Sequence, residues 1–250
     1  MSTEKEILRI EHLYKKYDDL TVLEDINLTV HEGEIIVIVG PSGCGKSTFL
    51  RCLNGLEEIS EGHIYLENEA VNPSSRSISK MREKIGMVFQ SYDLFPHKSI
   101  LENVTMAPVL VQKRKKDEVK QEALKLLERV GLSAKINNYP RQLSGGQKQR
   151  VAIVRALIMH PEVLLFDEVT AALDPEMVRE VLDVMLDLAK QKRTMLIVTH
   201  EMAFARAVAD RVIFLDGGHI VEDSDPKKFF DSPETERARK FLSTFEFEEK

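Results

Sequence analysis

Residues 34–50 read EIIVIVGPSGCGKSTFL, and this stretch decides the fold. Its first part, EIIVIV, predicts a buried strand, and STFLRCLNGL at 47–56 predicts the helix that follows. Between them, GPSGCGKST at 40–48 matches the pattern G-x-x-x-x-G-K-[ST] of a phosphate-binding loop. Glycines let backbone N–H groups surround phosphates, while Lys46 can reach the β and γ phosphates and Ser47 can ligate Mg²⁺. The stretch predicts a nucleotide site at the carboxyl end of a strand.

The composition is that of a globular protein. The chain has 250 residues, enough for one large α/β domain or a domain with a smaller insertion, and 43% of them are hydrophobic and 30% charged. No apolar run approaches the roughly 20 residues of a membrane-spanning helix, and the charged N-terminus MSTEKEILRIEH has no signal-peptide core. These features predict a cytosolic protein.

Charge and cysteine content exclude several classes of protein. The net charge of −6 argues against broad nucleic-acid binding, so no nucleic-acid partner is expected. The most basic run, QKRKKDEVKQ at 112–121, contains acids and leads into a helical pattern near 117–130, which favours a solvated helix start. Cys44 and Cys52 are too few for a disulfide framework and are expected to be reduced, and no Cys/His cluster has the spacing of metal ligands.

Three further strand patterns end in polar residues. The runs VLLFDE at 163–168, TMLIVTH at 194–200 and KIGMVFQ at 84–90 suggest a parallel sheet with its chemistry at the strand carboxyl ends. Asp-Glu after a strand is, by itself, more often a surface turn, and a lone histidine or glutamine there is more often structural. Beside a phosphate loop the functional interpretation becomes the favoured one. Asp167 is then a candidate Mg²⁺ ligand and Glu168 a candidate general base. His200 and Gln90 are candidates for contacts to phosphate, Mg²⁺ or water.

A second helix start also suits an anion. In RQLSGGQKQRVAIVRALIMHP, residues 141–161, Ser144 is a natural N-cap, and Gly145 and Gly146 leave backbone N–H groups uncovered. One chain therefore contains two helix N-termini that are suited to binding phosphate.

The remaining pattern is mixed. The first third is β-rich, about 91–160 is mainly helical, and the polar stretch 67–80 is expected to be a loop. Asp174 is expected to cap a helix, and a hairpin is expected to turn at 217–218.

Six elements, in their order and spacing, resemble the ATP-binding subunits of ABC transporters, and the resemblance covers essentially the whole chain. They are GPSGCGKST at 40–48, Gln90, LSGGQ at 143–147, VLLFDE at 163–168, AALD at 171–174, and His200. The resemblance implies an α/β fold: a P-loop NTPase (RecA-like) core with a parallel sheet, an N-terminal antiparallel β subdomain and an inserted helical subdomain. Within a single ABC ATPase domain at 1–250, the expected core is 1–90 and 161–250, and the expected helical signature subdomain is about 91–160.

The resemblance also implies a head-to-tail dimer that sandwiches ATP, in which LSGGQ of one chain contacts the γ-phosphate held by the other. ATP would then be bound in one chain by Tyr17, Gly40, Pro41, Ser42, Gly43, Cys44, Gly45, Lys46, Ser47, Thr48 and Gln90, and in trans by Ser144, Gly145, Gly146, Gln147 and Asp174. Tyr14 is an alternative to Tyr17 for stacking on adenine. The implied catalytic residues are Glu168, His200, Lys46 and Gln90, and the implied Mg²⁺ ligands are Ser47, Gln90 and Asp167.

The segments SYDLFPHKSILENVTMAPV at 91–109 and THEMAFARAVADRVIFLDGGHIVE at 199–222 are similar to those of ATPases from polar amino acid uptake systems. This implies a Mg-ATPase bound peripherally at the cytoplasmic face of the membrane, working with permease subunits and indirectly with a solute-binding protein. The alternatives are an importer for methionine or another small solute, and a non-transport ABC ATPase acting on DNA or ribosomes.

Three details stay open on the sequence alone. Residues 91–104 suit a groove for a permease helix, or else Tyr92, Leu94 and Phe95 pack the helical insertion. Cys44 is either protected from thiol reagents by ATP or points into the sheet and does not react. Val169 and Ala171 replace the family's common proline and serine, which puts the geometry and rate of hydrolysis in doubt.

Overall fold

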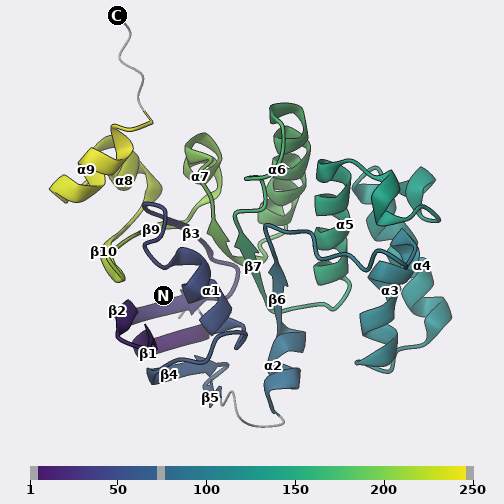
Figure 1. The fold of residues 1–250 in the computed structure, drawn as a ribbon, viewed down its shortest axis with the longest axis horizontal. Coiled ribbons are helices and arrows are strands. Elements are labelled where there is room, and N and C mark those ends of the chain that lie inside the picture. The colour runs from purple at the N-terminus through teal and green to yellow at the C-terminus, as the bar shows by residue number, and fades with distance from the viewer. Residues whose placement is uncertain (1–4, 72–76, 246–250) are drawn as a thin grey trace, which may run out of the picture. The chain divides into compact units, whose positions relative to one another are not determined.

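The computed structural model describes residues 5–71 and 77–245 (Figure 1). The described residues form two compact units, one within Met1–Arg82 and Lys192–Lys250 and the other within Glu83–Gln191. No helix in the described part of the chain is long and apolar enough to cross a membrane.

The first unit begins with an antiparallel sheet. Its strand order is β2-β1-β4-β5, with bounds Leu20–His31, Glu6–Tyr17, Glu61–Leu66 and Glu69–Ala70. Buried side chains alternate with more exposed ones over parts of these strands, as at Leu8 and Ile10 of β1 and Ile26 and Leu28 of β2, and register shifts interrupt the alternation. This alternation places one face of the sheet in the core.

The second sheet of this unit carries the phosphate loop. Strands β10 (His219–Ser224), β9 (Arg211–Asp216), β3 (Ile35–Val39) and β8 (Thr194–Val198) lie in that order, and β3 is parallel to both β8 and β9. Every residue of β3 and β8 is buried, as expected for parallel strands covered on both faces. The predicted hairpin is confirmed, because Gly217 and Gly218 join β9 to β10 with φ of 55° and 84°.

Helices accompany these strands. They are α1 (Lys46–Leu53), α2 (Ser77–Lys84), α7 (Met202–Val208), α8 (Pro226–Asp231) and α9 (Glu236–Leu242). The loop expected at 67–80 is wrong in part, because 69–70 form β5 and α2 begins at Ser77; residues 72–76 lie outside the described part of the chain. The short β5 pairs with β4, so tertiary pairing outweighs the local polar composition.

The second unit has two parallel strands and four α-helices among its described elements. They are β6 (Ile85–Val88), β7 (Val163–Asp167), α3 (Ile100–Leu110), α4 (Lys116–Arg129), α5 (Gly145–Leu157) and α6 (Pro175–Lys190), with 3-10 turns at Ser133–Lys135 and Pro140–Gln142. The periodicity that predicts the helix near 117–130 is confirmed as α4, whose buried residues include Val119, Ala123 and Leu127. They pack in one hydrophobic cluster with Ile100, Val151 and Val154 from α3 and α5.

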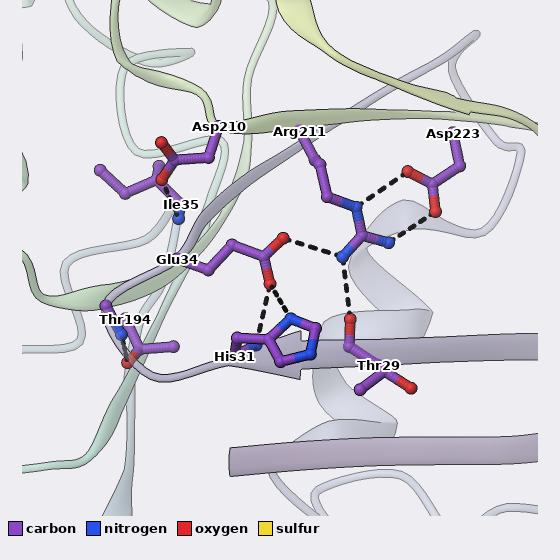
Figure 2. A network of polar contacts seen from close by, with 9 residues as sticks. Thr29, His31, Glu34, Ile35, Thr194, Asp210, Arg211 and Asp223 are labelled. Atoms are coloured by element: carbon purple, nitrogen blue, oxygen red, sulfur yellow. Dashed lines mark hydrogen bonds and ion pairs between the residues drawn. The ribbon is translucent and has the colours of Figure 1, made fainter. Parts of the chain in front are cut away.

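A polar network ties the first unit together at the start of β9 (Figure 2). The Arg211 guanidinium donates to Glu34 at 2.8 Å, to Asp223 at 2.6 and 3.0 Å, and to the Thr29 carbonyl at 3.0 Å. The hydrogen bonds to Asp223, followed by those to Glu34, raise the pKa of Arg211. Because Thr29 is in β2, Asp223 in β10 and Glu34 just before β3, one side chain joins both sheets.

Replacing Arg211 with Met keeps the aliphatic stem and removes all of these bonds. The side chain of Glu34 is only 11% exposed. Its carboxylate would therefore lose the Arg211 guanidinium at a position where water cannot fully replace that ion pair. We expect the free energy of unfolding to fall by about 2 kcal/mol in urea denaturation. The control Arg193→Met, at an exposed position, should change it by less than about 0.5 kcal/mol. Equal stabilities of the two variants would contradict the role given to the network.

Candidate nucleotide-binding site

The loop between β3 and α1 is tightly curled. Gly40 and Gly45 have φ of 153° and 105°, a region that favours glycine. A Cβ on Gly40 would lie 2.0 Å from the Leu215 carbonyl oxygen, and one on Gly45 would lie 2.8 Å from a methyl of Leu23. The glycines of the motif are therefore required by the backbone path and by the neighbouring strands.

The start of α1 has the electrostatics of an anion site. Gly45 is the N-cap in left-handed conformation and supplies no capping side chain, and the first turn contains no acidic residue. Lys46 is buried, and its Nζ donates to the carbonyls of Gly40 and Pro41 at 2.9 Å each. The loop thus carries a fixed positive charge, as the motif predicts.

His200 lies at the same edge of the sheet as the phosphate loop. Strands β3 and β8 are parallel, with Ile38 opposite Val198, and both strands end within one residue of that pair. His200 is exposed there, immediately before Glu201, the N-cap of α7. The sequence prediction that this histidine shares an edge with the loop is confirmed.

Tyr17 and Tyr14 differ in their surroundings. Burial and then a hydrogen bond to Glu57 raise the pKa of Tyr17, and the Lys15 ammonium lies 4.3 Å from its ring centroid. Burial and then Asp25 and Glu24 raise the pKa of Tyr14. Glu57 follows α1, the helix that opens at the phosphate loop, so Tyr17 is the better candidate for adenine.

In the second unit, Gln90 and the Asp-Glu pair share another strand edge. Strands β6 and β7 are parallel, with Val88 opposite Phe166, so Gln90 and Glu168 each follow that pair by two residues. Asp167 is buried at the end of β7. Glu168 has φ of 46°, a left-handed conformation that other described non-glycine residues of this chain, such as Asp18 and His160, also adopt.

The helix start at Ser144 is confirmed, with a reciprocal cap. Ser144 accepts from the Gln147 backbone N–H at 3.3 Å, and the Gln147 side chain accepts from the Ser144 N–H at 3.1 Å. The Ser144 hydroxyl therefore acts as an acceptor in the cap, which leaves its own proton for donation. Asp174 caps α6 with a single hydrogen bond, its carboxylate accepting from the Met177 N–H at 3.1 Å, and Pro175 occupies the first helical position.

The two glycines after Ser144 have a role that the sequence reasoning missed. A Cβ on Gly145 would lie 2.8 Å from both a Leu173 methyl and the Tyr92 hydroxyl, and one on Gly146 would lie 2.9 Å from the Met177 Cβ. The Gly146 N–H donates to the Met177 sulfur at 3.3 Å. Glycine is needed here for close packing within the chain. The Gly146 N–H, which the sequence predicts to be uncovered, is engaged by this sulfur. The only sequence signal near Met177 is the helix start that Asp174 predicts, and that signal does not say that this helix packs on Gly146.

Comparisons with known proteins identify relatives of this chain. A family model described as ABC transporter matches residues 23–171. The glutamine transport ATP-binding protein GlnQ of Geobacillus stearothermophilus is 54% identical over 92% of this chain and 95% of its own. The glutamate/aspartate import ATP-binding protein GltL of Escherichia coli K12 is 54% identical over 95% of this chain and 98% of its own.

Solved structures share the fold. The cbiO1 protein of Clostridium perfringens, part of the ABC transporter complex cbiONQ, has a TM-score of 0.82 and 33% identity, with 96% of each chain covered. The dimeric ATP-binding cassette MJ0796, bound to ADP and Pi, has a TM-score of 0.80 and 33% identity over 88% of this chain and 99% of that one. This chain belongs to the ABC transporter family.

The two cysteines are buried free thiols. Burial raises the pKa of Cys44, partly offset by Lys46, and raises the pKa of Cys52 to about 12. A Cβ on Gly40 would lie 3.0 Å from the Cys44 sulfur, which places this thiol inside the curled loop. These observations favour the unreactive alternative for Cys44.

Alkylation by iodoacetamide is therefore expected to be slow in the native protein. The thiolate is the nucleophile, and unfolding returns both pKa values to about 8.5, so at pH 8 the native chain should react about tenfold or more slowly than the urea-unfolded chain. Mass spectrometry of wild type, Cys44→Ser and Cys52→Ser assigns each thiol. Equal rates for native and unfolded protein would contradict the burial of these sulfurs.

Proposed function

We propose that this chain is the ATP-hydrolysing subunit of an ABC importer for a polar amino acid, bound peripherally at the cytoplasmic face of the membrane. The observation that carries the proposal is the phosphate loop, with its glycine-capped helix and buried Lys46, in a chain 54% identical over nearly its full length to the glutamine and glutamate/aspartate transport proteins named above. An importer for another small solute is the second candidate, and those relatives make it the less favoured one.

The residues present fit Mg-ATP. The hydroxyl of Ser47, the amide oxygen of Gln90 and the buried carboxylate of Asp167 are oxygen donors of the kind that Mg²⁺ takes. Bound Mg²⁺ would neutralise charge on the β and γ phosphates. Lys46 and the N–H groups at the start of α1 would hold those phosphates, and Tyr17 would stack on adenine.

Glu168 is the proposed general base. It directly follows Asp167 at the carboxyl end of the buried strand β7. The carboxylate would orient water for attack on the γ-phosphate and accept its proton, while His200 would contact the same phosphate. The effect of Val169 and Ala171 on the rate stays a prediction to be measured.

A second copy of the chain is the proposed partner at the other helix start. The Ser144 hydroxyl keeps a proton to donate, and the start of α5 carries the positive end of the helix dipole. A phosphate held by the loop of a second chain would use both, with Gln147 and Asp174 at the same surface. The dimeric state of the MJ0796 cassette supports this arrangement.

Replacing Glu168 with Gln keeps the shape of the side chain and removes the base. ATP affinity should stay within about twofold, the hydrolysis rate should fall by about 10²–10⁴, and ATP should hold the chain as a dimer in gel filtration. Glu176→Gln, at an exposed position in the first turn of α6, is the matched control and should hydrolyse normally. Hydrolysis at the wild-type rate by the Glu168 variant would contradict the assignment of Glu168 as the general base.

We also propose where the permease docks. A hollow of about 400 Å³ lies on α3 and α4 and is lined by Lys98, Leu101, Glu102, Thr105, Met106, Val109, Leu110, Lys116 and Lys120. Its floor is apolar, Leu110 is 59% exposed, and three lysines border it. A short amphipathic permease helix with acidic residues would match both its apolar floor and its charge. For residues 91–104 the sequence left docking and packing as alternatives. There, Leu94 packs on the hydrophobic cluster, whereas Phe95 is exposed.

Replacing Leu110 with Glu should block docking without affecting the nucleotide site. We expect hydrolysis by the isolated chain within about twofold of wild type, and transport by the assembled importer reduced about tenfold or more. Leu56→Glu, at a leucine with 45% exposure outside the hollow, serves as the control. Normal transport by the Leu110 variant would place the permease elsewhere.

A further inference from the structure

Helix α5 holds the backbone on both sides of Gln90. Gln149 Nε2 donates to the Phe89 carbonyl at 3.1 Å. Arg155 donates to the Tyr92 carbonyl at 3.2 Å and to the Asp93 carbonyl at 2.5 Å. All three acceptors are main-chain oxygens, so the attachment fixes the path of the segment, whatever its side chains are.

The side chains that make these bonds are not what packing alone would select. Gln149 is fully buried, and its Oε1 has no hydrogen-bond partner among residues 5–71 and 77–245. Methionine would fill a similar volume without an unpaired acceptor. Burial also lowers the pKa of the Arg155 guanidinium, partly offset by Asp93. Both positions hold costly polar groups that donate to main-chain carbonyls on either side of Gln90.

Tyr92 extends the attachment to the first turn of α5. Its hydroxyl lies 2.8 Å from the position of a Cβ on Gly145, and Lys148 Nζ is 5.8 Å from its ring centroid. The segment 89–93 therefore contacts α5 from Gly145 to Arg155, about 15 Å along the helix.

We propose that Gln149 and Arg155 are positioning residues for Gln90, because they fix the backbone on both sides of it relative to α5. This inference rests on the proposed role of Gln90 at the nucleotide. Neither residue touches the reacting atoms; both act through the backbone that carries Gln90.

The attachment is tested first without ATP. In the full chain, Gln149→Met removes the amide at similar volume, and Arg155→Lys removes the fork that reaches two carbonyls. Hydrogen exchange of the amides at 89–94 should accelerate about tenfold in both variants. The matched controls Gln121→Met and Arg129→Lys, at exposed positions in α4, should leave that exchange unchanged. Unchanged exchange in Gln149→Met and Arg155→Lys overturns the proposal, whatever the activity.

The link to Gln90 is tested by a double-mutant cycle. Gln149→Met should lower kcat about tenfold with ATP affinity within about twofold, and adding it to Gln90→Ala should cause no further loss. Losses that multiply would overturn the link, because Gln149 would then act independently of Gln90. Normal kcat in Gln90→Ala alone would instead contradict the proposed role of Gln90 itself, and that single variant identifies this outcome.

Discussion

The structure depends on the backbone N–H groups at the start of α1, a helix that begins at a glycine without a capping side chain. A strand buried along its whole length, β3, delivers the chain to Gly40, and the positive φ of Gly45 starts the helix without a side-chain cap. Any residue with a Cβ at these two positions would collide with the strands alongside. The fold of the first unit is arranged to hold this short loop, and Lys46 adds a buried positive charge to it.

The other chemical groups follow from one property of parallel strands. Because parallel strands end at the same edge, His200 is brought to the edge that carries the phosphate loop, and Gln90 to the edge that carries Glu168. The Arg211 network braces the opposite end of β3, where Glu34 enters the strand. Rigid support at one end and chemistry at the other is how a sheet keeps a site in place while its loops bind ligand.

Much of this could be predicted from residue patterns. The phosphate loop, the caps at Ser144 and Asp174, and the hairpin at Gly217 each have a local physical signature, and the structure has all of them. Contacts between residues distant in sequence left no such signature. Met177 beside Gly146, and Gln149 and Arg155 on the carbonyls near Gln90, depend on how α5 packs in its unit. The strand β5 was missed because its pairing with β4, and not its own composition, makes it a strand.

The central claim is that the helix starts at Gly45 and Ser144 of one chain bind the phosphates of two different nucleotides. Mixing two inactive variants tests it most directly: Lys46→Ala lacks the loop charge, and Ser144→Arg blocks the second helix start. A mixed dimer would contain one site with both parts intact, so the mixture should recover up to about a quarter of wild-type hydrolysis. If both helix starts instead served one nucleotide in the same chain, the mixture would be as inactive as each variant alone.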